Sequence, residues 1–86
     1  MKIIWTIHAE DRQREWERMK GLTREVVQNV VRRPDQVVPG DLSILIAQSQ
    51  WRGGLLRVPF IETDQGRKLI TVYWTSRVRR YWREQP

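Results

Sequence analysis

The spacing of hydrophobic residues changes along the chain and separates a helical part from an extended part. Residues 1–7 are mostly β-branched and aromatic, which predicts a short strand. Residues 8–20 show no alternation and have few apolar positions, so we expect a largely exposed helix that Gly21 ends. Thr23 is placed to cap a second helix, in which valines recur at helical spacing until Pro34.

After Pro34 the apolar residues alternate with polar ones, as they do in strands. Strands are expected over three segments: residues 42–50, 55–62 and 68–75. Pro39–Gly40 and Gly53–Gly54 are turn signals, and residues 63–67 form a connecting loop. Pro59 has no amide hydrogen to donate, so we expect a bulge or an unpaired edge at that position.

Pairing the last two strands through the 63–67 loop fixes their register. Opposite residues then have numbers that sum to about 130. Three apolar pairs fall on one face: Leu56 with Trp74, Val58 with Val72, and Phe60 with Ile70. Arg57 and Tyr73 form a pair on the other face.

Two segments allow more than one interpretation. The core face of residues 42–50 is one of two alternating sets, either Leu42, Ile44 and Ile46 or Leu45 and Ala47. Residues 76–82 fit either a continued strand or a short helix capped by Ser76, and we favour the helix.

Together these segments predict a single domain over residues 1–86 in the α+β class. The expected order is β-α-α-β-β-β, with an antiparallel sheet covered on one face by two helices. The other face, or part of it, would be open and would carry Arg57 and Tyr73.

Composition excludes several kinds of chemistry. The chain has no Cys and one His, so disulfides, thiolate catalysis, iron–sulfur clusters and multi-histidine metal sites are excluded, and we predict no cofactor and no metal. No apolar run approaches the roughly 18–20 residues of a membrane span. We therefore expect a soluble, cytoplasmic protein.

Positive charge is concentrated in the second half of the chain. Residues 1–50 carry eight Lys and Arg against seven Asp and Glu, whereas residues 51–86 carry eight against three. Most of these cations are Arg, which suits bidentate contact with phosphate or carboxylate and stacking on aromatic rings. This basic half of the chain is compatible with binding to RNA, to an acidic protein or to another anionic surface.

Several short motifs spread over nearly the whole chain carry a family resemblance. They are His8-Ala9-x-x-Arg12, Arg33-Pro34-Asp35, Leu56-Arg57-Val58, Ile70-Thr71-Val72-Tyr73 and Arg80-Tyr81-Trp82. With them the chain resembles a family of small bacterial proteins of unknown function allied to the BrnT and RelE toxins. The resemblance implies a compact sheet backed by helices and, in the toxins, metal-independent ribonuclease activity blocked by a partner antitoxin.

Candidate site residues follow from this chemistry. Metal-free RNA cleavage needs a base, an acid and cations for the developing phosphorane charge. The candidate catalytic residues are Arg57, Tyr73, His8 and Arg12. The candidate nucleic-acid-binding residues are Arg52, Lys68, Arg77, Arg79, Arg80 and Tyr81.

Two functions are compatible with these residues. The first is a toxin-type metal-independent ribonuclease or RNA-binding domain that acts on RNA or the ribosome and has an acidic, antitoxin-like partner. The second is a non-catalytic interaction module that binds an acidic protein across the open sheet face. The sequence leaves the oligomeric state open.

Overall fold

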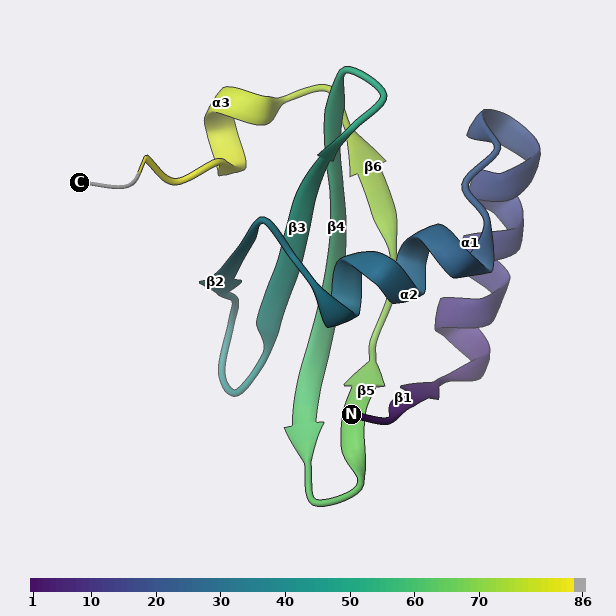
Figure 1. Cartoon of the computed structure of the whole chain (residues 1–86), viewed down its shortest axis with the longest axis vertical. Coiled ribbons are helices and arrows are strands. Elements are labelled where there is room, and N and C mark those ends of the chain that lie inside the picture. Colours follow the sequence, from purple (N-terminus) through teal and green to yellow (C-terminus); the bar gives the residue numbers. More distant parts are fainter. Residues whose placement is uncertain (85–86) are drawn as a thin grey trace.

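The structure, a computed structural model, describes residues 1–84 and contains one sheet with helices packed around it (Figure 1). The elements in chain order are β1 (Ile3–Trp5), α1 (Ile7–Lys20), α2 (Arg24–Arg32), β2 (Gln36–Pro39), β3 (Leu45–Trp51), β4 (Gly54–Thr63), β5 (Gly66–Leu69), β6 (Tyr73–Thr75) and α3 (Val78–Tyr81). This arrangement confirms the α+β class. The expected order lacked β2 and α3 and joined β5 and β6 into one strand.

The sheet is mixed. Its strands lie in the order β1-β5-β4-β3-β2, and β6 pairs with β4 beyond the end of β5. β1 runs parallel to β5, whereas the other paired strands are antiparallel. The purely antiparallel sheet expected from the sequence is therefore wrong at β1, whose partner lies more than sixty residues later in the chain.

Pro59 explains why the expected strand 68–75 is divided in two. The Pro59 carbonyl accepts a hydrogen bond of 2.8 Å from the Ile70 amide. The N–H and C=O of a strand residue point to the same side of the strand. The amide hydrogen that Pro59 lacks would therefore also have faced Ile70. The pairing slips by one residue there, from Phe60 opposite Leu69 to Arg57 opposite Tyr73. Such a slip is what a bulge produces, as expected at this proline.

This one-residue shift in register determines which of the predicted cross-strand residue pairs are observed. Leu56 lies opposite Trp74 and Arg57 lies opposite Tyr73, as predicted. Phe60 lies opposite Leu69, so its predicted pairing with Ile70 is wrong. The predicted 63–67 loop is also too long, because β4 ends at Thr63 and β5 begins at Gly66.

Gly66 is required where the N-terminal segment meets this turn. Its φ angle is +142°, and a Cβ there would lie 2.1 Å from the carbonyl oxygen of Lys2. The next residue, Arg67, donates its amide to the same oxygen at 2.9 Å. Only a glycine permits this close approach, which seats β1 beside β5.

The helix boundaries follow the expected caps. α1 begins at Ile7, one residue earlier than predicted, Thr6 caps it by accepting from the Ala9 amide, and Gly21 ends it at φ +71°, as predicted. Thr23 caps α2 as predicted, through a hydrogen bond from the Val26 amide.

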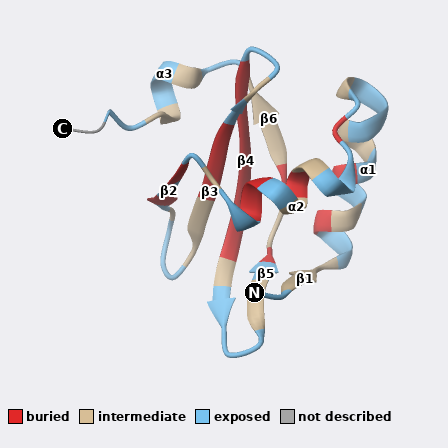
Figure 2. Cartoon of the chain, in the orientation of Figure 1, coloured by how far each residue is buried: buried red, intermediate tan, exposed pale blue. Residues whose placement is uncertain are grey.

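The core lies between α2 and the facing side of β3 and β4 (Figures 1 and 2). Its fully buried members include Val27 and Val31 of α2 and, from the sheet, Ala47, Val58 and Phe60. The alternative core face with Leu45 and Ala47 is therefore the observed one. Leu42 lies outside β3, is 99% exposed and has a φ of +55°.

α1 lies beside the β6 end of the sheet and is mostly exposed, as predicted (Figure 2). Ala9 and Gln13 are its buried residues. Within residues 1–84, no helix has the length and apolar character needed to cross a membrane.

Candidate nucleic-acid interface

A row of polar side chains crosses four strands on the sheet face opposite α2. Gln36 of β2 is the register partner of Gln48 of β3, which is the partner of Arg57 of β4, and Arg57 is the partner of Tyr73 of β6. Because side chains alternate along a strand, these four lie on the face away from the buried Ala47 and Val58. We call Gln36, Gln48, Arg57 and Tyr73 the polar row.

Hydrogen bonds connect the polar row from one end to the other. Gln48 Nε2 donates to Gln36 Oε1 at 2.9 Å, and Arg57 Nε donates to Gln48 Oε1 at 2.9 Å. Arg57 Nη1 donates to the Tyr73 hydroxyl. The predicted Arg57–Tyr73 pair is thus a direct contact, and two glutamines extend it.

The C-terminal segment covers this row, so the face is not open there as the sequence suggested. Gln48 Nε2 donates to the Tyr81 carbonyl at 3.0 Å. The Arg83 amide donates to Gln36 Oε1 at 3.1 Å, and Gln36 Nε2 donates back to the Arg83 carbonyl. The segment supplies main-chain partners for two glutamine amides whose burial would otherwise cost free energy.

Arg57 carries a buried positive charge among neutral partners. The residue is 6% exposed, and its guanidinium carbon lies 4.0 Å from the centre of the Tyr81 ring and 5.6 Å from that of Tyr73. No carboxylate in residues 1–84 forms an ion pair with it. The two rings and the Gln48 carbonyl therefore supply the partial negative charge that a carboxylate would usually provide.

Exposed arginines surround the covering segment. Arg77, Arg79 and Arg80 are exposed, and the Arg80 guanidinium lies 5.5 Å from the centre of the Tyr81 ring. The short helix expected over residues 76–82 is present as α3, but no side chain caps it, so the predicted Ser76 cap is wrong. The Arg77 amide instead donates to the Thr75 hydroxyl at 3.1 Å.

Acidic partners separate the arginines of the protein into two groups. Ion pairs join Arg12 to Glu15, Arg14 to Asp11, Arg24 to Glu10 and Arg67 to Glu62. Within residues 1–84, no arginine from Arg77 onward has an acidic partner. The arginines around α3 are therefore among those available to anionic groups from outside the chain.

The structure does not bring all of the candidate catalytic residues together. His8 and Arg12 are exposed in the first half of α1, at the end nearest β1 (Figure 1), and Arg12 is paired with Glu15. Neither is hydrogen-bonded to Arg57 or Tyr73 in the described residues. The predicted set of four thus divides into a connected pair on the sheet and an exposed pair on α1.

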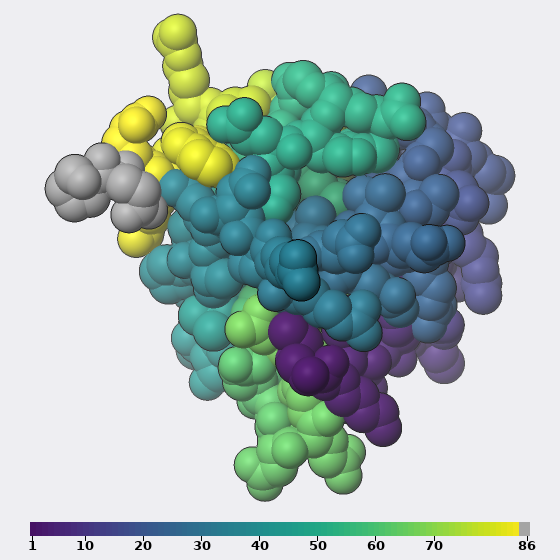
Figure 3. Space-filling model, in the orientation of Figure 1, coloured from purple at the N-terminus to yellow at the C-terminus, as the bar shows by residue number. Residues whose placement is uncertain are grey.

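The remaining candidates also separate. Arg52 is exposed at the tip of the β3–β4 hairpin with its guanidinium 4.8 Å from the centre of the Trp51 ring. This tip adjoins the β6–α3 connection, because a Cβ on Gly54 would lie 2.3 Å from the Thr75 carbonyl oxygen. Figure 3 shows the yellow C-terminal residues beside this green hairpin. Lys68 lies on β5, beyond the register slip and away from α3 (Figure 1).

Sequence reasoning missed the two glutamines of the polar row. The signal was present at Gln48, a polar residue in the middle of the run Leu45–Trp51, where a strand buried on both faces would have apolar residues. A two-residue turn at Arg52–Gly53 would have placed Gln48 opposite Arg57. The role of Gln36 depends on Arg83, which is distant in sequence.

The fold and site define a small α+β protein with a buried arginine beneath an arginine-rich surface. Comparisons with protein-family models, curated proteins and solved structures give no match to this chain. In residues 1–84, no three His, Cys, Asp or Glu side chains gather as a metal site.

Proposed function

We propose that the protein binds single-stranded RNA through the surface around α3. We call this the arginine–tyrosine surface and define it by Tyr73, Arg77, Arg79, Arg80 and Tyr81, which surround the buried Arg57. The observation that carries the proposal is the group of exposed arginines without acidic partners beside a tyrosine ring. Single-strand binding typically combines cations that follow the phosphates with aromatic rings on which bases stack.

The position of this surface on the fold supports the proposal. In this proposal, α1 and α2 both pack on one side of the sheet. The side that carries the polar row is then left for the RNA. Tyr81 is half-buried, so part of its side chain is accessible beside Arg80. RNA with unpaired bases suits such a surface better than duplex RNA, whose bases are already stacked.

A toxin-type ribonuclease, as the resemblance to the BrnT and RelE toxins implies, is a second candidate. One contact favours it, the hydrogen bond from Arg57 Nη1 to the Tyr73 hydroxyl. A phenol beside a guanidinium could protonate a leaving oxygen while the cation stabilises the phosphorane. Binding remains the leading proposal because His8, the candidate base, lies on α1.

The test compares two double variants that remove equal charge from different surfaces. Arg79→Gln/Arg80→Gln removes two arginines of α3, and Arg12→Gln/Arg14→Gln removes two ion-paired arginines of α1. Binding of labelled single-stranded RNA is measured by fluorescence anisotropy in EDTA over a range of salt. We expect the α3 variant to bind more weakly and its salt slope to fall by about 0.7 for each phosphate that the variant no longer neutralises.

Equal affinities of the two double variants would contradict the proposal, because net charge alone would then explain binding. If the wild-type protein binds no RNA, an interaction module with an acidic protein partner becomes the better explanation. Cleavage is assayed in the same samples. RNA cleavage in EDTA that Tyr73→Phe abolishes would favour the ribonuclease.

A further inference from the structure

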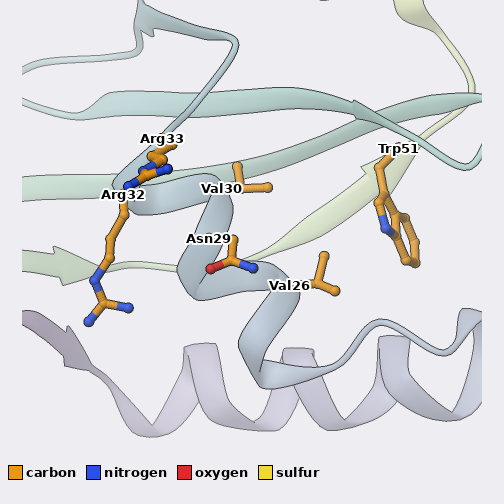
Figure 4. Close-up of a pocket in the computed structure, with 6 residues that line it drawn as sticks. All are labelled: Val26, Asn29, Val30, Arg32, Arg33 and Trp51. Atoms are coloured by element: carbon orange, nitrogen blue, oxygen red, sulfur yellow. The ribbon is translucent and has the colours of Figure 1, made fainter.

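A groove of about 630 Å³ lies on the other side of the sheet, between α2 and the end of β3 (Figure 4). Its lining residues are Val26, Asn29, Val30, Arg32, Arg33 and Trp51. We call it the α2 groove. Its volume falls within the roughly 300–1,000 Å³ typical of small-ligand sites.

The α2 groove has an apolar middle with different chemistry at its two ends. Val30, which is 7% exposed, and the half-buried Val26 lie between Trp51 and the C-terminal end of α2 (Figure 4). Trp51 is half-buried and presents part of its indole, whereas Arg33 is exposed at the opposite end and the exposed Asn29 lies between that end and Val26. A ligand with a flat apolar part and an anionic part would match this arrangement.

Contacts of both its main chain and its side chain restrict Trp51 before any ligand arrives. Its main chain pairs with Gly54 in the β3–β4 ladder and accepts from Trp74 Nε1 at 2.9 Å, and its half-buried indole packs against the core. A fixed aromatic side chain loses little conformational entropy when a base stacks on it. The cations at the other end are uncompensated, because neither Arg32 nor Arg33 forms an ion pair within residues 1–84.

The β3–β4 hairpin connects this groove to the arginine–tyrosine surface. Arg52 follows Trp51 at the hairpin tip, and the tip adjoins the connection that leads into α3. A strand that passes over Arg52 would meet cations on both sides of the tip.

We propose that the α2 groove is a nucleotide subsite for the same RNA strand. One unpaired base stacks on Trp51 against Val26, the Asn29 amide hydrogen-bonds to the base edge, and Arg33 contacts a neighbouring phosphate. The inference rests on the proposed RNA binding and extends it to the opposite face of the protein. A nucleotide fits better than an apolar peptide because the charged residues of the lining are all arginines.

Variants of Trp51 separate stacking from charge. In anisotropy titrations with the same labelled RNA, we expect Trp51→Leu to weaken binding by about tenfold with an unchanged salt slope, since stacking contributes about 1–3 kcal/mol per base. Trp51→Phe keeps a ring and should recover much of the affinity. Thermal melting of each variant checks folding, because Trp51 also packs against the core.

Arg33→Gln tests the groove without touching the core. We expect weaker binding and a salt slope reduced by about 0.7, since the variant neutralises one phosphate fewer. The matched control is Arg18→Gln, because Arg18 on α1 is exposed like Arg33. This control variant should bind RNA as the wild type does. Photocrosslinking with RNA that contains bromouridine should label Trp51.

The outcomes distinguish this inference from the proposed function. If the wild type binds RNA and the α3 variant binds weakly, the proposed function stands. If Arg33→Gln and folded Trp51→Leu then bind like the wild type and crosslinks avoid Trp51, the α2 groove is not a nucleotide subsite. If the wild type binds no RNA, both proposals fail.

Discussion

At the scale of single residues, Arg57 shows how neutral groups hold a buried charge. A buried cation without a carboxylate loses its hydration and receives only partial compensation from hydrogen-bond acceptors and rings. Here the Gln48 carbonyl, the Tyr73 hydroxyl and the Tyr81 ring share that compensation. Arg57 is therefore part of the folded structure as well as a candidate for phosphate contact.

Replacing Arg57 is expected to affect stability before it affects any ligand. Arg57→Ala leaves a cavity beneath Tyr81 and leaves Gln48 Oε1 without its donor, so we expect a loss of about 2–4 kcal/mol in unfolding free energy. Arg57→Met refills most of the space without a charge and should lose less. Urea denaturation measures both. An Arg57→Ala protein as stable as the wild type would show that the polar row contributes nothing.

At the scale of elements, α3 is held by main-chain hydrogen bonds and by the Tyr81 ring over Arg57, and it has no core of its own. It has four residues, no side-chain cap and no buried residue. An isolated helix of this length is unstable in water. Its position therefore depends on the glutamine contacts to Tyr81 and Arg83 together with the packing of the Tyr81 ring on Arg57.

Gln36→Leu should loosen the C-terminal segment and leave the rest of the sheet intact. The Arg83 amide loses its acceptor, so we expect its hydrogen exchange to become about fivefold to tenfold faster, given about 1 kcal/mol for such a bond. Gln50→Leu, at an exposed position of β3, is the control. Unchanged exchange at Arg83 in the Gln36 variant would mean that other contacts hold the segment.

Local signals in the sequence predicted much of this architecture. The caps at Thr23 and Gly21 depend on neighbouring residues, and the Arg57–Tyr73 pair follows from alternation and a nearby turn. The pairing of β1 with β5 could not be predicted, because no local pattern specifies a parallel partner so distant in sequence. The covering of Arg57 was missed for the same reason, since it depends on where Tyr81 docks.

At the scale of the whole molecule, positive charge exceeds negative charge, and arginines on both α2 and α3 have no acidic partner within residues 1–84. The formal net charge is +6, and ion pairs within α1 neutralise Arg12 and Arg14. Self-repulsion among the remaining cations destabilises the folded state, and bound anions relieve it.

Phosphate should therefore stabilise the protein more than chloride does at the same ionic strength. We expect a Tm higher by a few degrees in phosphate, through binding to the folded state. Phosphate also stabilises proteins in general by exclusion from their surface. The Arg79→Gln/Arg80→Gln variant separates the two effects, and an equal gain in that variant would argue against specific anion binding at α3.

The pairing of β1 with β5 also has a consequence for the order of events during synthesis. β1 acquires its partner strand only after Gly66–Leu69 has been made, and the Thr6 hydroxyl that caps α1 also donates to the Leu69 carbonyl at 2.8 Å. Contacts so distant in sequence form late, because the intervening chain must first be ordered. Until the ribosome has released β5, the nascent chain carries Ile3–Trp5 as an apolar strand without a neighbour. A chain that ends at Thr63 should thus aggregate, whereas the full chain buries that strand edge.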